Sequence, residues 1–202
     1  MNAHMTTAAS NPENQDRGAI ITSETKLVLV MADGAGGLSG GTEAAVMAVD
    51  LIRQHVSTLD GPDSCTGLIQ EIDQAIAKHK VAGETTCVIA AVNLDEIFGA
   101  SVGDSGAWLI DESGHLDLTQ RQVRKPLAGS GSACPVPFRH KSTSGRHLLL
   151  ATDGLFKYSS SERITAICRR GALDEIARQL IELVRYPSGS LPDDVTVIVG
   201  EL

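Results

Sequence analysis

The chain has 202 residues, enough for one domain with a sizeable core, and 42% of them are hydrophobic, as in ordinary globular proteins. Its 17 basic and 25 acidic residues give a net charge of -8, which argues against nucleic acid or an anionic membrane as the main partner. The sequence has no apolar run of about 18 residues and no signal peptide pattern, so we expect a cytoplasmic protein.

The N-terminal residues 1–13 are polar, and they predict a mobile tail ahead of a single folded domain over residues 14–202. Apolar residues in 18–33 predict two short strands joined by a turn near Ser23–Glu24. Apolar side chains at helical spacing then predict helices over residues 40–59 and 65–80.

The pattern changes to strands after the second helix. Three stretches rich in β-branched and small apolar residues predict strands over 85–94, 97–104 and 106–119, the last folded back at a hairpin turn over 112–114. Residues 121–142 are rich in Gly, Pro and Ser, and they predict an irregular connection.

The C-terminal part of the chain predicts a strand over 145–153, helices over 159–171 and 172–186, and a last strand over 192–202. Strands and helices do not alternate regularly along the chain, so a doubly wound parallel sheet does not fit. The order favours an α+β fold in which two antiparallel sheets are each covered by helices.

Aspartates recur where the predicted strands end. Asp33, Asp104 and Asp153 each follow an apolar strand and lie within two residues of a glycine, and Asp193 precedes the last strand. One Asp-Gly pair is ordinary turn chemistry, but four strand ends of this kind indicate a shared site. The glycine-rich stretch after Asp33 lacks the third glycine of a dinucleotide loop and the Gly-Lys-Ser/Thr of a phosphate loop.

Converging carboxylates repel one another unless cations neutralise them. A site built from oxygen ligands, with no Cys or His spacing typical of zinc, favours Mg²⁺ or Mn²⁺. Two such ions can activate water and promote displacement at phosphorus. A glycine beside an aspartate also lets its carbonyl oxygen approach a metal closely.

Six motifs now occur in one order along the chain: NQD at 14–16, VMADGAGG at 30–37, GETT at 83–86, ASVGDSGAWL at 100–109, LLLATDGLF at 148–156 and DDVTVIV at 193–199. This set resembles the metal-dependent serine/threonine protein phosphatases of type 2C, the PPM family, in a compact form typical of bacteria. The resemblance implies a four-layer α-β-β-α sandwich with a dinuclear Mn²⁺ or Mg²⁺ site between two sheets. It also implies that a metal-bound water attacks phosphoserine or phosphothreonine.

The resemblance also implies a role for each matching residue. Asp33 would bridge the two metals, and the Gly34 carbonyl would bind one of them. Asp153 and Asp193 would bind the other metal, so that Asp33, Asp153 and Asp193 form the catalytic set. Asp16 would hold metal-bound waters, and Asp104 would bind a third and weaker metal.

The chain departs from the family pattern at the residue that grips the phosphate. Asn11 stands where the family has an Arg, and Asn supplies neither a charge nor a bidentate fork. The best substitutes are the basic residues of the irregular segment, Arg121, Arg124 and Lys125. Asp194 follows Asp193 where the family usually has Asn, and the motif register favours Asp193 as the ligand.

The sequence thus predicts a phosphoric monoester hydrolase that acts on a phosphorylated protein, opposes a cognate kinase in a signalling circuit, and uses two or three Mn²⁺ or Mg²⁺ ions. The alternative is a pseudophosphatase, a module that binds a phosphoprotein or a kinase without turnover. The missing Arg supports that alternative, and the retained aspartates oppose it, because unneutralised acids gain nothing from being close together.

Overall fold

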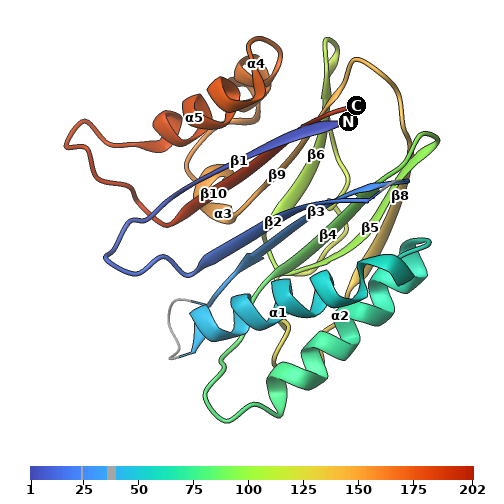
Figure 1. Cartoon of the computed structure of the whole chain (residues 1–202). Coiled ribbons are helices and arrows are strands. Elements are labelled where there is room, and N and C mark those ends of the chain that lie inside the picture. Colours follow the sequence, from blue (N-terminus) through green and yellow to red (C-terminus); the bar gives the residue numbers. More distant parts are fainter. Residues whose placement is uncertain (24, 36–39) are drawn as a thin grey trace.

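Two five-stranded sheets lie face to face in the computed structural model, which describes residues 1–23, 25–35 and 40–202 (Figure 1). Sheet A has the strand order β1 (Asn2–Ala8), β10 (Val195–Glu201), β9 (His147–Ala151), β6 (Gly106–Asp111) and β7 (Gly114–Asp117). Sheet B has the order β2 (Asp16–Thr22), β3 (Leu27–Asp33), β4 (Cys87–Val92), β5 (Glu96–Val102) and β8 (Val136–Lys141). Neighbouring strands pair antiparallel in both sheets.

Helices cover the outer face of each sheet. Sheet B is covered by α1 (Gly41–His55) and α2 (Pro62–Ala77), with the short 3-10 helix η1 (Val56–Thr58) between them. The other layer contains α3 (Asp153–Phe156), α4 (Ser161–Cys168) and α5 (Leu173–Val184). This arrangement confirms the predicted α+β class and the four-layer α-β-β-α sandwich. None of the helices in the described residues has the length and apolarity needed to cross a membrane.

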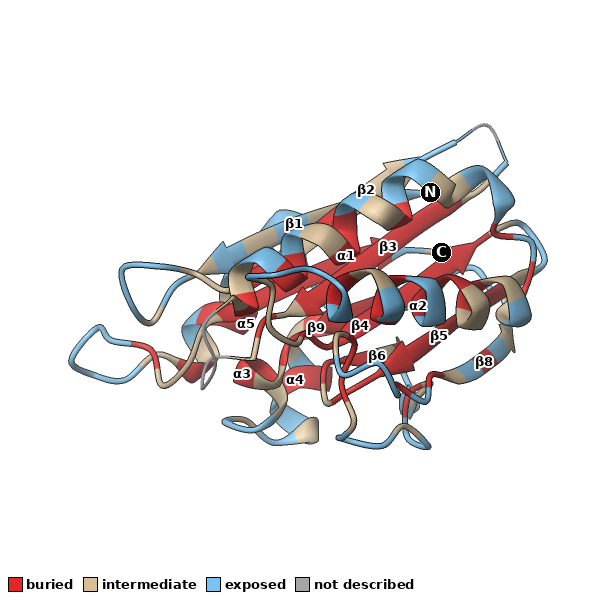
Figure 2. Cartoon of the chain, turned by 90° about the horizontal axis from the view of Figure 1, so that it is seen from below, coloured by how far each residue is buried: buried red, intermediate tan, exposed pale blue. Residues whose placement is uncertain are grey.

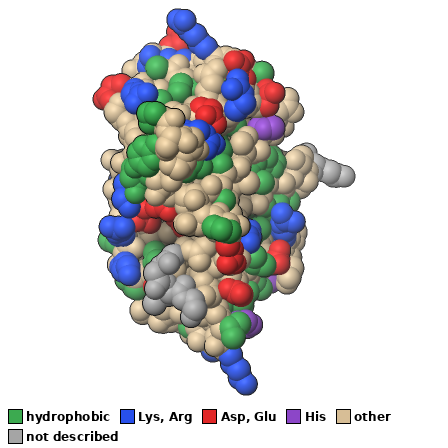
Figure 3. Space-filling view, turned by 90° about the vertical axis from the view of Figure 1, so that its left-hand side faces the viewer, with side chains coloured by type: hydrophobic (Ala, Val, Ile, Leu, Met, Phe, Trp, Pro, Cys, Tyr) green, Lys and Arg blue, Asp and Glu red, His purple; other side chains and the backbone are tan. Residues whose placement is uncertain are grey.

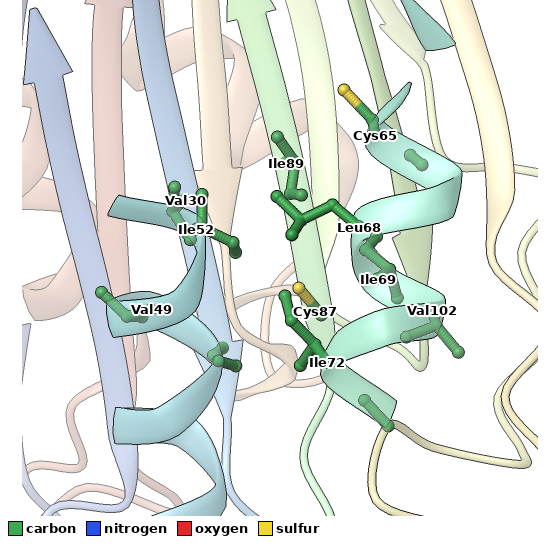
Figure 4. Close-up of a cluster of buried hydrophobic side chains, with 14 of the residues drawn as sticks. Val30, Val49, Ile52, Cys65, Leu68, Ile69, Ile72, Cys87, Ile89 and Val102 are labelled. Atoms are coloured by element: carbon green, nitrogen blue, oxygen red, sulfur yellow. The ribbon is translucent and has the colours of Figure 1, made fainter. Parts of the chain in front are cut away.

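Strand β3 shows how the sandwich is held together. Its alternate residues Leu27, Leu29 and Met31 belong to the core between the sheets, whereas Val28, Val30 and Ala32 belong to the core under α1 and α2. Both of its faces are therefore buried, and Figure 2 shows such buried strands beneath helices with exposed outer surfaces. Figure 4 shows the second of these cores, in which side chains of α1 and α2 meet those of sheet B.

The prediction of a mobile tail over residues 1–13 is wrong for the strand β1. Residues 2–8 pair with β10 from Asn2 opposite Glu201 to Ala8 opposite Val195. A polar stretch can form this strand because the pairing rests on main-chain hydrogen bonds and on polar contacts. One of these joins the Thr7 and Thr196 hydroxyls, 2.8 Å apart. Composition therefore concealed an edge strand.

The predicted irregular connection over residues 121–142 also needs correction, because β8 occupies its last part. Pro137 lies inside this strand, and β8 tolerates it as the edge strand of sheet B. In the turn predicted near Ser23–Glu24, the Ser23 amide donates to the Lys26 carbonyl at 2.9 Å, and Glu24 lies outside the described residues. Helix α3 was not predicted.

Candidate active site

The predicted aspartates meet at one end of the sandwich. Asp33 ends β3, Asp104 lies in the turn after β5, Asp153 opens α3 after β9, and Asp193 precedes β10. All four line one cleft of about 630 Å³, together with Gly34. The fifth acid, Asp16, is the first residue of β2 and lies opposite Asp33 in the β2–β3 ladder.

Asp16 is buried, and its carboxylate is only half satisfied. The Thr152 hydroxyl donates to its Oδ2 at 2.9 Å, but its Oδ1 has no hydrogen-bond partner among the described residues. Burial raises the pKa of Asp16 to about 6, and the hydrogen bonds from Thr152 and Thr196 only partly oppose that rise. A buried oxygen without a donor favours a cation or an ordered water as its partner.

The main chain of Asp33 is fixed by the two threonines of the GETT motif. The Asp33 amide donates to the Thr86 hydroxyl at 2.9 Å, and its carbonyl accepts from the Thr86 amide at 2.8 Å and the Thr85 hydroxyl at 2.9 Å. Burial first, and then the charges of the nearby acids with Asp16 foremost, together raise the pKa of Asp33 to about 9. The fold therefore holds a carboxyl group where its negative charge is unfavourable without a cation.

Close packing explains the glycines that follow two of the aspartates. A Cβ on Gly34 would lie 2.4 Å from the carbonyl group of Gly41, at the start of α1. A Cβ on Gly154 would lie 2.0 Å from the Asp194 carbonyl oxygen. Both glycines let one backbone approach another directly beside an acid of the cleft.

The adjacent acids Asp193 and Asp194 have different surroundings. Asp194 accepts hydrogen bonds from the Ser10 amide at 2.7 Å, the Ser10 hydroxyl at 3.0 Å and the Gln15 amide at 2.8 Å. It thereby ties the loop after β1 to the start of β10. The carboxylate of Asp193 accepts from the Asp194 amide at 3.0 Å. Asp194 therefore has a structural task, which leaves Asp193 as the better candidate ligand.

Basic side chains also reach the cleft. Arg124, Lys125 and Lys157 line it, and Arg124 Nε lies 2.7 Å from Asp104 Oδ2. Burial raises the pKa of Asp153, as do Asp104 and Asp193, while Lys157 and Arg124 oppose the rise. Figure 3 shows a face on which Lys and Arg side chains lie along the margin of an acidic patch.

The predicted phosphate-binding candidates are only partly brought to the cleft. Asn11 lines it, and its amide donates to the Ser10 hydroxyl at 3.0 Å. Arg121 lines a different hollow, between β7 and β8. Lys157 was missed because the short helix α3, which places it one turn after Asp153, was not predicted. Thr152, the residue directly before Asp153, was also missed because its contact with Asp16 spans the two sheets.

The acids of the cleft fit a divalent cation only in part. No three His, Cys, Asp or Glu in the described parts of the chain form a group that could hold a metal ion. Mg²⁺, however, commonly keeps several waters, so carboxylates of a site can hold it through water as well as directly. Two observations fit such an ion. The Oδ1 of Asp16 has no hydrogen-bond partner among the described residues, and the pKa of Asp33 is raised by burial and by other acids rather than lowered by a positive charge.

One protein family matches most of the chain. Residues 6–185 match the family described as protein phosphatase 2C. The fold and this match define a phosphatase of the 2C class. The chain therefore belongs to the protein phosphatase 2C family, which confirms the resemblance found in its motifs.

Individual relatives are distant in sequence. Protein phosphatase PTC7 homolog fig of Drosophila melanogaster is 27% identical over 89% of this chain and 75% of its own length. A crystal structure of a bacterial serine phosphatase has a TM-score of 0.87 at 21% identity, covering 100% of this chain and 97% of that one. Serine/threonine phosphatase Stp1 from Staphylococcus aureus has a TM-score of 0.86 at 21% identity, covering 99% and 94%. At these identities the solved structures support the fold alone.

Proposed function

We propose that the chain is a metal-dependent protein serine/threonine phosphatase, a phosphoric monoester hydrolase. The observation that carries this proposal is the gathering of Asp33, Asp104, Asp153 and Asp193 around one cleft, above a buried Asp16 with an unpartnered oxygen. Such a set of acids is unfavourable by itself and becomes favourable when cations occupy it. A solved structure that shares this fold, the catalytic domain of the phosphatase PstP, is in complex with 2 manganese ions.

The residues that would hold Mn²⁺ or Mg²⁺ are those that the motifs predicted. Asp33 would contact two cations, the Gly34 carbonyl one of them, and Asp153 and Asp193 the other. Asp16 would hold coordinated water, and Asp104 a third and weaker ion. When bound, the cations supply Lewis acidity and a water that can act as nucleophile at neutral pH.

The chain's own residues prepare the site for this chemistry. Thr85 and Thr86 hold the Asp33 main chain in place, and Thr152 orients the Asp16 carboxylate. Arg124, Lys125 and Lys157 bring positive charge to the cleft, where an incoming phosphate dianion needs it. These contacts position the groups before substrate arrives, so little reorganisation is left to the reaction.

The substrate would be a phosphorylated protein, as the family match implies, and the mainly polar and charged lining of the cleft suits a phosphate group. A regulatory role that opposes a cognate kinase is part of the proposal. It draws support from the family alone.

The test is hydrolysis of p-nitrophenyl phosphate and of a phosphothreonine peptide with Mn²⁺, with EDTA and with the variant Asp153→Asn. We expect turnover that requires the metal and is lost in the variant. Calorimetric titration with Mn²⁺ gives a second readout, in which Asp153→Asn should weaken binding without unfolding the protein. Folded wild-type protein that binds Mn²⁺ but hydrolyses neither substrate would overturn the general phosphatase and favour a binding module.

A further inference from the structure

One of the connections between the two sheets contributes to the wall of the cleft. Residues 118–135, here called the crossover segment, run from β7 of sheet A to β8 of sheet B. Within this segment Arg124, Lys125 and Leu127 line the cleft. The position of two basic side chains of the cleft, Arg124 and Lys125, therefore depends on how firmly this segment is held.

A buried acid on α2 holds the second half of the crossover segment. Asp73 is 2% exposed, and its Oδ1 accepts from the amides of Gly129 at 2.8 Å and Gly131 at 2.9 Å. Its Oδ2 accepts from the Ala133 amide at 3.2 Å. Hydrogen bonds to an ionised acceptor are stronger than neutral ones, so three of them on one carboxylate make a strong anchor.

The local backbone is shaped to make these contacts. Gly129 and Gly131 have φ values of 106° and 77°, in the left-handed region that favours glycine. Alternating left-handed residues turn successive amides toward one point, which creates a concave anion site. In this protein the anion is an internal side chain, Asp73. A Cβ on Gly129 would lie 2.5 Å from the Gly83 carbonyl oxygen, so the loop also packs tightly.

The first half of the crossover segment is tied to the turn that carries Asp104. The Gln122 side chain donates to the Ser105 carbonyl at 2.7 Å, and the Gly103 amide donates to the Val123 carbonyl at 3.3 Å. The Arg124–Asp104 ion pair uses the guanidinium Nε, and a guanidinium has further N–H donors on its terminal nitrogens. These terminal groups match the fork that a phosphate needs.

Asp73 therefore contacts the same crossover segment that carries Arg124 and Lys125. Resting on the proposed function, we propose that Asp73 is a positioning residue that fixes the crossover segment, so that Arg124 and Lys125 receive the substrate phosphate. Asn11, the other cleft residue at a phosphate-binding position, brings no charge to this task. In this proposal Arg124 and Lys125 take the place of the phosphate-binding Arg that Asn11 replaces. Asp73 on α2 sets the position of the segment that carries them.

The test compares KM and kcat for a phosphothreonine peptide with saturating Mn²⁺. The variant Asp73→Asn keeps the shape of the side chain but loses its charge and one acceptor. We expect its KM to rise about five- to tenfold, with kcat within about twofold of the wild type. In a background with Arg124→Ala and Lys125→Ala, where KM is already high, Asp73→Asn should add less than about twofold.

Two matched variants separate positioning from general destabilisation. Ile72→Val changes the neighbouring residue of α2, which is buried in the core against sheet B, and should leave KM unchanged. Lys157→Ala removes a cleft cation carried by α3, so its effect on KM should multiply with that of Asp73→Asn. A KM for Asp73→Asn equal to that of Ile72→Val would overturn the proposal, as would an undiminished effect in the background without the two cations.

Amide hydrogen exchange and peptide binding test the proposal independently of turnover. Asp73→Asn should speed exchange at Gly129, Gly131 and Ala133, and should weaken binding of the phosphothreonine peptide measured by calorimetry. If the wild type fails to hydrolyse the peptide yet both effects appear, the proposed phosphatase function fails and the positioning role stands. If hydrolysis is normal and neither effect appears, the positioning role fails alone.

Discussion

The acids of the site form an inner pair, Asp16 and Asp33, and an outer pair, Asp104 and Asp153, and the two pairs differ in how their charge is balanced. Asp16 and Asp33 face each other in neighbouring strands, and burial is the largest cause of their raised pKa values, about 6 and about 9. Asp104 has Arg124 at 2.7 Å, and the charges of Lys157 and Arg124 oppose the rise in the pKa of Asp153. No positive charge is thus among the main causes that shift the pKa values of the inner acids, whereas the outer acids have basic side chains beside them.

The largest difference between the two regions should appear in turnover. Asp33→Asn removes the acid that most needs a cation, and we expect kcat with Mn²⁺ to fall by about three orders of magnitude. Asp104→Asn removes an acid that already has a side-chain partner and should cost only about tenfold. Steady-state kinetics on a phosphothreonine peptide checks both variants, and equal losses would erase the distinction between inner and outer acids.

The neighbouring acids Asp193 and Asp194 provide the next test. Both acids line the cleft, but the Asp193 carboxylate accepts only from the neighbouring Asp194 amide among the described residues. Asp193→Asn should therefore lower turnover by more than about a hundredfold and leave thermal stability almost unchanged. Asp194→Asn disturbs the contacts with Ser10 and Gln15 and should lower the free energy of unfolding by about 1–3 kcal/mol. Denaturant unfolding and kinetics on the same two preparations would reveal a reversed assignment as exchanged effects.

The inner pair also predicts a pH dependence of stability in EDTA. The folded chain keeps the Asp33 proton up to about pH 9 and the Asp16 proton up to about pH 6, whereas the ordinary pKa of both is 3.8. The folded state therefore binds more protons, and this contribution to stability is full below about pH 4. It is lost as pH rises to the folded values, by at most about 1.4 kcal/mol per pH unit for each proton.

Urea unfolding at pH values from 5 to 9 measures this slope. Asp33→Asn should flatten the slope between pH 6 and 9, because Asp33 keeps its proton in the folded state up to about pH 9, whereas Asp16 loses its proton near pH 6. Saturating Mn²⁺ should flatten it as well, by replacing the proton with a cation. A slope in EDTA that Asp33→Asn leaves unchanged would show that the Asp33 carboxylate is ionised without metal.

The smallest effect concerns the charge that Asn11 does not bring. Asn11→Arg places a guanidinium at the edge of the cleft and should lower KM for the phosphothreonine peptide about threefold, since Arg binds phosphate bidentately. Asn11→Gln, which adds length but no charge, is the control and should leave KM unchanged. If both variants behave alike, the cations of the crossover segment and α3 already satisfy the phosphate.

Much of this site could be predicted from sequence because its acids lie at strand ends. An apolar run identifies β3, and a carboxylate at the end of such a buried strand must lie where the strands leave the sheet. The four acids at such ends indicated one site, and the structure places all of them on one cleft. The two-sheet architecture followed in the same way from the order of strands and helices.

The parts that escaped prediction depend on contacts between distant residues. Strand β1 is polar and exists because β10 pairs with it, 189 residues away at the Thr7–Thr196 contact. The anchoring role of Asp73 depends on amides more than 50 residues further along, which no local pattern reveals. Pro137 concealed β8, because prolines are acceptable only at a sheet edge and the edge itself is a tertiary property.

The pairing of β1 with β10 has a consequence for how the protein is made. The loop that leads from β1 to Asp16 is secured by Asp194, so the inner end of the cleft is completed by residues from both ends of the described chain. During synthesis on the ribosome, residues 2–8 must wait until residues 195–201 have emerged before they can pair. A nascent chain therefore carries Asp16, Asp33, Asp104 and Asp153 before the sheet that brings them together at one end of the sandwich is complete.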